Sequence, residues 1–265
     1  MSALTLSEIW IYPIKSMGGI PLTSSGITPK GLVHDRRWML IDGNGTFMTQ
    51  RVFPKMALFK LTLEPDKFII RHRTHSIALP FNSAPSGNLI ETKIWDDTVI
   101  TREVGTTYNQ WFSAALEMDC KLVYFPENNP RPVDSRYKVN NDHVSLADGY
   151  PFLIIGQESL HDLNSRLEEN LPMNRFRPNF VFTGGTAYEE DTWRHFKIGN
   201  NGFIGVKPSS RCVLTTINQD TGKKGVEPLK TLANYRKRNN KIYFGQNVIA
   251  LDYGQISVGE SITLN

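Results

Sequence analysis

The chain has 265 residues, 40% of them hydrophobic, with a formal net charge of +4 and a pI near 9.0. This length and apolar fraction suit one large or two modest globular domains and exclude a disordered or fibrous chain. No stretch approaches the ~18 consecutive apolar residues of a membrane span. The N-terminal stretch places no basic segment before its apolar run, so we expect a cytoplasmic protein without a secretory signal or a membrane partner.

The first hundred residues predict short strands separated by turn signals. Such regular spacing is typical of a small β-barrel or sandwich. The expected elements are a strand at 4–15, a hairpin at 38–50 around Asp42-Gly-Asn-Gly45, and hairpins that pair 58–63 with 68–73 and 92–95 with 98–104.

A helix is predicted at 106–118, because its aromatic and apolar residues recur at about 3.6-residue spacing. A strand should follow at 121–126. The polar, proline-containing run 127–142 then predicts a long loop and a domain boundary. We therefore expect an N-terminal domain at 1–126 and a second domain at 127–265.

The second half predicts further strands with few helices. Expected strands are 152–155, 179–183, 195–198, 202–208 and 211–218, with helices at 158–169 and 228–236 and two final strands, 248–252 and 255–264, joined by a tight glycine turn. The predicted fold class is therefore mainly β with a few helices (α+β), an N-terminal β-barrel-like domain followed by a second β-barrel domain.

Only two cysteines occur, Cys120 and Cys212, so a disulfide framework is excluded, and no CxxC or CxxH spacing indicates a zinc or iron–sulfur site. A lone cysteine is commonly a small buried hydrophobe. Cys212 differs because it follows Pro208-Ser-Ser-Arg211 inside residues 201–238, which hold eight Lys or Arg against two acidic residues. In such surroundings its thiol could be a nucleophile, a sulfur acceptor or a ligand for a soft or high-valent metal.

Basic residues also stand beside rigid or turn-forming residues at distant positions in the chain. Bidentate arginines and hydroxyls in such places indicate a phosphorylated ligand, although no GxGxxG or P-loop motif is present. Nucleic acid is the rival anion. We do not expect it as a partner, because the tryptophans (Trp10, Trp38, Trp95, Trp111, Trp193) fall in predicted strand or helix cores rather than among the basic residues. The basic segments are Tyr12-Pro-Ile-Lys-Ser16, His34-Asp-Arg-Arg-Trp38 and Phe176-Arg-Pro-Asn179.

Several segments together resemble the MOSC domain and the β-barrel domain that precedes it. The C-terminal match is Pro208-Ser-Ser-Arg-Cys-Val-Leu-Thr-Thr216 with Asp220-Thr-Gly222 and Glu227-Pro-Leu-Lys-Thr-Leu232, and the N-terminal match is Trp10-Ile-Tyr-Pro-Ile-Lys-Ser16 with Asp35-Arg-Arg-Trp38. Between them lie Asp148-Gly-Tyr-Pro-Phe-Leu-Ile-Ile155 and Phe176-Arg-Pro-Asn179. The series is similar to the amidoxime-reducing components and, more distantly, to the C-terminal region of molybdenum cofactor sulfurase.

The resemblance implies a molybdenum–molybdopterin cofactor between two domains, with Cys212 as the catalytic cysteine and the thiolate ligand of the metal. It also implies a set of residues that line the pterin and its phosphate. These are Lys15, Ser16, Arg36, Asp148, Gly149, Tyr150, Arg177, Asn179, Ser210 and Arg211, with Gln246 and Asn247 as weaker candidates.

The activity that this resemblance implies is reduction of N-hydroxylated small molecules by oxygen-atom transfer. A separate ferredoxin-, cytochrome- or flavin-type electron donor would then be required. The alternative is a sulfur carrier or molybdopterin-handling protein that uses a Cys212 persulfide. The family is also associated with pyridoxal phosphate binding, but no lysine motif for that cofactor is evident in the chain.

Overall fold

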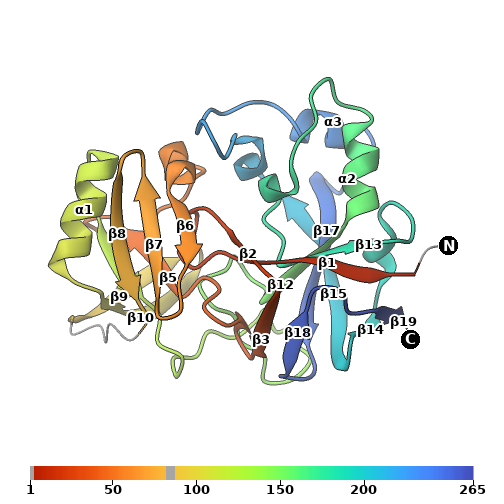
Figure 1. The fold of residues 1–265 in the computed structure, drawn as a ribbon, viewed down its shortest axis with the longest axis horizontal. Helices are drawn as coiled ribbons and strands as arrows, with labels where there is room; N and C mark the ends of the chain where they lie inside the picture. Colours follow the sequence, from red (N-terminus) through yellow and green to blue (C-terminus); the bar gives the residue numbers. More distant parts are fainter. Residues whose placement is uncertain (1–2, 82–86, 265) are drawn as a thin grey trace.

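The computed structural model describes residues 3–81 and 87–264, so Met1 and Ser2 of the N-terminal stretch lie outside it. The described residues form two lobes, one holding α1 and β5–β11 and the other holding β1 and β12–β19 (Figure 1). Strands dominate and helices are few, which confirms the predicted mainly β class. No helix in these two described ranges is long and apolar enough to cross a membrane.

The larger lobe is built on a nine-stranded sheet in the order β19-β14-β15-β17-β12-β13-β1-β2, with β16 paired to β17. Its neighbours are antiparallel except β12 and β13, which run parallel. The first strands of the chain therefore pair with strands from its second half. The bounds are β1 Thr5–Ile11, β2 Ile20–Leu22, β12 Phe152–Gly156, β13 Phe180–Thr183, β14 His195–Ile198, β15 Asn201–Arg211, β16 Lys237–Arg238, β17 Lys241–Ala250 and β19 Ile262–Leu264.

The smaller lobe contains the four-stranded sheet β5-β11-β10-β9 and the three-stranded sheet β6-β7-β8. The hairpins predicted on either side of residues 64–67 and of residues 96–97 are confirmed as β6–β7 and β9–β10. Strand β8 has no counterpart in the predicted elements. The bounds are β5 Trp38–Ile41, β6 Lys60–Leu63, β7 Lys67–His72, β8 His75–Pro80, β9 Leu89–Ile94, β10 Asp97–Glu103 and β11 Lys121–Tyr124.

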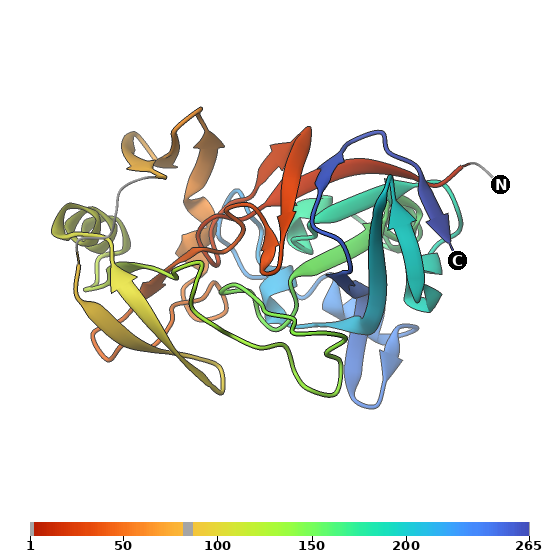
Figure 2. The same cartoon turned by 90° about the horizontal axis from the view of Figure 1, so that it is seen from below.

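A fourth sheet, β18-β3-β4, joins the two ends of the chain, with β3 at Ser24–Thr28, β4 at Gly31–Leu32 and β18 at Gln255–Ser257. Figure 2 shows β3 beside β18 from a second direction. Strand pairing thus crosses the boundary expected at residue 126, so that boundary does not separate the sheets.

Three α-helices and four short 3-10 helices complete the described fold. Helix α2 ends five residues before its predicted end, because the Asn164 side chain pairs with both the N–H and the C=O of Leu171 and the chain leaves the helix. The bounds are α1 Thr106–Leu116, α2 Gln157–Asn164, α3 Leu229–Ala233, η1 Pro54–Leu58, η2 Met173–Arg175, η3 Glu189–Thr192 and η4 Val213–Thr216.

Two predictions for the C-terminal region are wrong. Residues 202–208 and 211–218 are not separate strands, because β15 continues through two bulges to Arg211 and a 3-10 helix follows. The strand predicted at 248–252 is the end of the longer strand β17, and the one predicted at 255–264 is divided into β18, which pairs with β3, and β19, which pairs with β14.

The main core extends from the large sheet into the smaller lobe. Phe152, Phe180 and Phe203 pack together in the large sheet, and Phe59, Phe68 and other apolar residues continue the same cluster. Burying such rings stabilises each lobe by a few kcal/mol per side chain. The two lobes therefore hold the loops between them in fixed positions.

Candidate functional site

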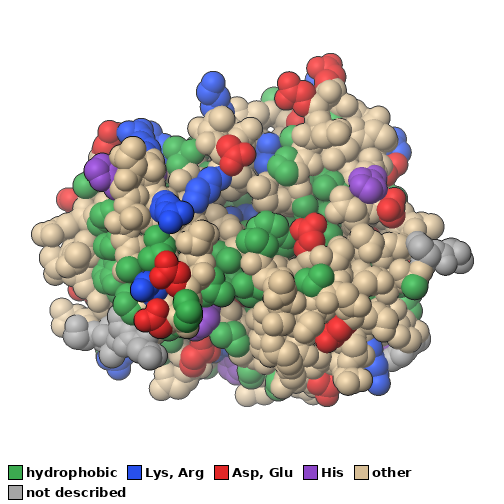
Figure 3. Space-filling view, viewed as in Figure 1, with side chains coloured by type: hydrophobic (Ala, Val, Ile, Leu, Met, Phe, Trp, Pro, Cys, Tyr) green, Lys and Arg blue, Asp and Glu red, His purple; other side chains and the backbone are tan. Residues whose placement is uncertain are grey.

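A cavity of about 260 Å³ lies where the end of β15 faces loops from the first half of the chain. On the face in Figure 3 several Lys and Arg side chains lie near the hollow between the two lobes, together with a few acidic ones. The cavity brings together seven separate segments. Its lining is Lys15, Ser16, Arg36, Arg51, Ala147, Asp148, Gly149, Tyr150, Phe152, Leu153, Phe176, Arg177, Asn179, Lys207, Pro208, Ser209, Ser210, Arg211, Cys212, Leu214, Thr215 and Asn247.

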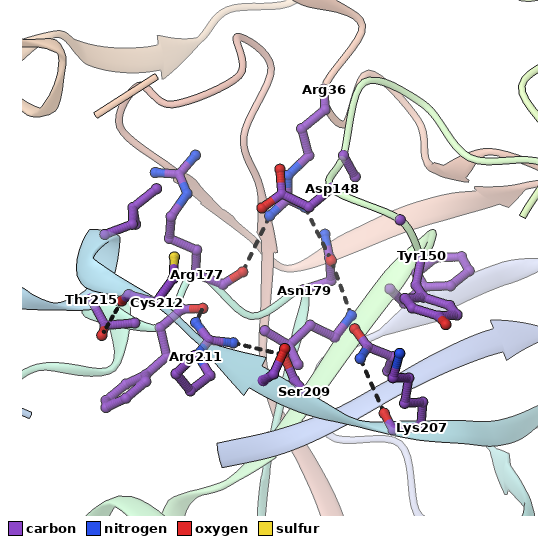
Figure 4. A pocket seen from close by; sticks show the side chains of 18 of the residues that line it. Arg36, Asp148, Tyr150, Arg177, Asn179, Lys207, Ser209, Arg211, Cys212 and Thr215 are labelled. Carbon is purple, nitrogen blue, oxygen red and sulfur yellow. Dashed lines mark hydrogen bonds between the residues drawn. The ribbon is translucent and has the colours of Figure 1, made fainter. Parts of the chain in front are cut away.

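Cys212 stands at the point where β15 ends and η4 begins. Its carbonyl oxygen accepts hydrogen bonds from the N–H and the hydroxyl of Thr215, at 3.1 and 2.9 Å, which fixes the backbone there. The side chain is half-buried, and its sulfur points into the space shared with Arg177 and Arg211 (Figure 4). The bulges of β15, at Gly205–Lys207 and Pro208–Ser210, change which side chains face the cavity just before Cys212.

Three lining residues have a left-handed backbone, with φ of 65° at Ser16, 51° at Arg36 and 56° at Arg177. This conformation is uncommon for residues other than glycine and tends to occur at functional sites. Each of the three lies in one of the basic segments identified from the sequence: Ser16 in 12–16, Arg36 in 34–38 and Arg177 in 176–179. These segments aim the side chains into one space.

Arg36 and Arg177 form a connected pair. The Arg36 guanidinium donates to the Asn179 side-chain oxygen and to the Arg177 carbonyl, at 3.1 and 3.2 Å. Both guanidinium groups stack on the Tyr12 ring, at 4.4 and 4.1 Å from its centroid. Burial lowers the pKa of Arg177 to about 10, so it remains charged at neutral pH. Two fixed cations therefore face the cavity side by side.

Arg211 is the residue before Cys212, and only the two terminal nitrogens of its guanidinium have hydrogen-bond partners among the described residues. Its two terminal nitrogens donate to the Ser209 hydroxyl at 3.0 Å and to the Phe176 carbonyl at 2.5 Å. Its Nε is buried and has no hydrogen-bond partner among the described residues. A buried donor without a partner costs about 1–3 kcal/mol, so a ligand that brought an acceptor to this atom would remove that cost.

Asp148 is the one acidic residue in a lining that also contains six Lys or Arg. It accepts from Lys15 Nζ at 2.6 Å and from an Arg51 terminal nitrogen at 2.8 Å. Burial alone would raise the pKa of Asp148, but Lys15 and Arg51 lower it well below its usual range. Burial lowers the pKa of Lys15 to about 8, against the attraction of Asp148. The lining is therefore strongly cationic and suits an anion.

The structure brings eleven of the twelve predicted cofactor-binding residues, and Cys212, to this one cavity. Gln246 is the exception and does not line the cavity. It is fully buried on the opposite side of β17 from Asn247, and its amide donates to the Trp193 carbonyl at 3.4 Å. Adjacent residues of a strand face opposite sides of the sheet, so only Asn247 can reach the cavity.

Arg51 and Lys207 line the cavity but were not predicted from the sequence. Arg51 carries no local signal, because it lies in an ordinary turn far from the other motifs. Lys207 stands one residue before the Pro208-Ser-Ser-Arg-Cys motif, so that motif could have been extended to it.

The prediction that every tryptophan falls in a strand or helix core is wrong for Trp95. This residue lies in the turn between β9 and β10, with 45% of its surface exposed.

Two family models match this chain, one in each half. The model of the MOSC N-terminal beta barrel domain matches residues 3–119, and that of the MOSC domain matches residues 141–263. Mitochondrial amidoxime-reducing component 1 of Mus musculus is 35% identical over 279 residues, which cover 98% of this chain and 82% of the relative. The Homo sapiens protein of the same name is 33% identical with the same coverage.

Molybdenum cofactor sulfurase of Oryza sativa subsp. japonica is 32% identical over 100% of this chain and 34% of its own length. The chain thus spans about a third of that longer relative, whereas it spans most of the amidoxime-reducing components. The first matched domain contains the lining residues Lys15, Ser16, Arg36 and Arg51, and the second contains all the others. The chain therefore belongs to the MOSC family, as a MOSC N-terminal beta barrel domain followed by a MOSC domain.

Proposed function

We propose that this protein is a molybdenum-cofactor-dependent reductase of N-hydroxylated small molecules, with Cys212 as the protein ligand of the metal. One observation carries the proposal. The Cys212 sulfur opens into a cavity whose lining contains six Lys or Arg and a single acidic residue. A soft sulfur beside many fixed cations suits a metal held by an anionic organic cofactor.

The residues present fit a phosphorylated pterin. Arg36, Arg177 and Arg211 offer guanidinium donors, and the Nε of Arg211 has no partner among the described residues and could donate to a bound anion. Among the described residues no group of three or more His, Cys, Asp or Glu converges. Cys212 would supply one sulfur ligand to the metal, and the dithiolene of the pterin would supply two more.

When bound, the molybdenum cofactor supplies the two-electron chemistry that removes the oxygen of an N–OH group as water. The residues of the chain hold and surround it. Arg51 Nε donates to the Cys212 sulfur at 3.1 Å, which orients the ligand atom. The reduction consumes two protons, and Lys15, with a pKa near 8 beside Asp148, can hold a proton at its Nζ at neutral pH. Electrons would come from a separate ferredoxin-, cytochrome- or flavin-type donor.

The test compares wild type with Cys212→Ser, both purified from a host that makes the cofactor. We expect near-stoichiometric molybdenum and pterin in wild type. In the variant we expect loss of metal or an altered metal spectrum, at least 100-fold lower amidoxime reduction and an unchanged circular dichroism spectrum. A variant that retains both the wild-type metal spectrum and wild-type turnover would refute the ligand assignment.

A sulfur-carrier function remains the alternative, because one relative is a molybdenum cofactor sulfurase and the guanidinium of Arg51 could also hold a persulfide at Cys212. The two functions differ in what the protein carries. Cyanide-labile sulfur released from metal-free protein would favour the carrier. Steady reduction of benzamidoxime with a chemical electron donor, in protein loaded with molybdenum, would favour the reductase.

A further inference from the structure

The guanidinium of Arg51 lies in a small cage next to Cys212. Asp148 accepts from its terminal nitrogen at 2.8 Å, and the ring centroid of Trp95 lies 4.3 Å from its central carbon. Its Nε donates to the Cys212 sulfur at 3.1 Å. A carboxylate, an aromatic face and a sulfur acceptor therefore surround one planar, nitrogen-rich cation. This is the set of groups that recognises such cations in general.

The cage has supports that do not depend on Arg51. The Trp95 indole N–H donates to the other oxygen of Asp148 at 3.2 Å, and Phe47 packs edge-on against Trp95 with ring centroids 4.9 Å apart. Trp95 also has a left-handed backbone, with φ of 55°. This conformation is costly for a bulky residue, and it turns the ring at the β9–β10 turn toward Asp148.

The cage is accessible, and its present occupant can leave it. The side chain of Asp148 is 56% exposed and that of Arg51 is 20% exposed. The Arg51 backbone is held independently, since its N–H donates to the Thr49 hydroxyl and its carbonyl accepts from Lys224 Nζ. The long Arg51 side chain can therefore swing out while the turn that carries it stays in place.

We propose that Trp95 and Asp148 form a subsite for a planar amidine or guanidine group, and that Arg51 fills this subsite until such a ligand displaces it. The subsite rests on the proposed function, because an amidine is what remains when the oxygen of an amidoxime is removed. A bound amidine would take the place of Arg51 on Asp148 Oδ2, while Oδ1 keeps Lys15 and the Trp95 indole N–H, and would lay its plane against the Trp95 ring. The same position lies beside the Cys212 sulfur, where the chemistry takes place.

The charges around the subsite predict the direction in which amidine affinity should change when Arg51 is replaced. Elsewhere the lining presents Lys and Arg, which repel an amidinium, so Asp148 is the one lining residue that attracts it. Arg51 competes for the same carboxylate and the same ring. Removing Arg51 should therefore strengthen amidine binding, although it removes three contacts from the folded protein. If Arg51 had only a structural role, its removal would not increase the affinity for an amidine.

The experiment measures benzamidine binding by isothermal titration calorimetry, using the full chain in both cofactor-free and cofactor-loaded form. Arg51→Gln should bind benzamidine about fivefold or more tightly than wild type, since the competing cation is gone. Trp95→Leu should bind about fivefold more weakly, with Trp95→Phe in between. Benzamide, which has the same shape without the charge, should bind at least tenfold more weakly than benzamidine.

Lys60→Gln is the matched control, because it removes one positive charge from an exposed ion pair with Asp220 and touches neither Trp95 nor Asp148. Equal gains in Lys60→Gln and Arg51→Gln would overturn the proposal, as would unchanged or weaker binding in Arg51→Gln. Absence of benzamidine binding in every variant would also overturn it. Molybdenum and pterin content, measured on the same samples, decides the proposed function separately from the subsite.

Discussion

At the scale of single residues, Arg177 shows how the cavity holds a flat guanidinium rather than a simple positive charge. Its terminal nitrogen donates to the Met17 carbonyl at 2.6 Å, and its plane stacks on Tyr12. A lysine would keep the charge but lose both the stacked plane and the second set of donors. The geometry of Arg177, more than its charge, should therefore determine how well an anionic cofactor is retained.

We expect Arg177→Lys to retain about tenfold less pterin than wild type after gel filtration, which corresponds to about 1.4 kcal/mol of binding energy. Fluorescence of the oxidised pterin released from each sample measures this content. Arg194→Lys is the control, because Arg194 donates to the Gly205 carbonyl at 3.3 Å and does not line the cavity. Equal pterin retention by Arg177→Lys and wild type would show that charge alone is enough.

The sequence was a better guide to which residues line the cavity than to which of them contact one another. Arg36, Arg177 and Arg211 each stand in a short motif with a turn or a rigid neighbour, and these signals are local. Arg51 has no such signal, because its importance comes from a 3.1 Å contact with a residue 161 positions away. Gln246 shows the opposite error, since it is next to a lining residue but faces the other side of its strand.

At the scale of elements, Glu190 in η3 links the end of β12 to α2 through hydrogen bonds to both. Its carboxyl group is fully buried and accepts from the Gly156 N–H at 3.2 Å and from the Ser159 hydroxyl at 2.9 Å. Burial raises the pKa of Glu190 from 4.5 to about 7, against these hydrogen bonds. The folded protein therefore keeps the Glu190 proton at pH values where the unfolded chain has lost it.

The free energy of unfolding should fall as the pH rises from about 4.5 to about 7 and then level off, because only the folded state binds this proton in that window. The loss is on the order of 3 kcal/mol. Glu190→Gln cannot ionise, so its stability should change less between pH 5 and pH 8. Urea unfolding at both pH values measures the difference.

The exposed residue Glu169 provides the control for this prediction, since Glu169→Gln removes a carboxylate from the surface. Its pH dependence should match that of wild type. If Glu190→Gln showed the same pH dependence as well, the buried carboxyl would not be the group that titrates in this range.

Local patterns located most elements but not their partners. Helix α1 and hairpins β6–β7 and β9–β10 follow from periodicity and turn residues, which act over a few positions. The pairing of β18 with β3 joins residues more than 200 positions apart, and no short pattern contains that information. The continuation of β15 through its bulges was likewise missed, because Pro208 within a run suggests the end of a strand.

At the scale of the whole molecule, the cavity exists because the two halves of the chain are interleaved. Gln50 and Gln219 are both buried and exchange two side-chain hydrogen bonds, at 3.1 and 3.0 Å, and Gln50 also donates to the Ser16 carbonyl. This contact joins a loop of the first half to the segment that follows Cys212. The positions of Ser16 and Arg51 relative to Cys212 therefore depend on the packing of the lobes.

The interleaved sheets predict that residues 127–265 cannot fold alone, although the sequence divides the chain there. Without the first 126 residues, β13 loses its neighbour β1 and β18 loses β3. The β13 edge thus exposed carries Phe180, Val181 and Phe182, all buried in the intact chain, and an exposed apolar edge strand promotes aggregation. The fragment 127–265 should form aggregates without a cooperative thermal transition, and co-expression with fragment 1–126 should recover a soluble complex. Gel filtration and calorimetry distinguish these outcomes. A monomeric fragment 127–265 with a sharp transition would mean that the large sheet does not need its N-terminal strands.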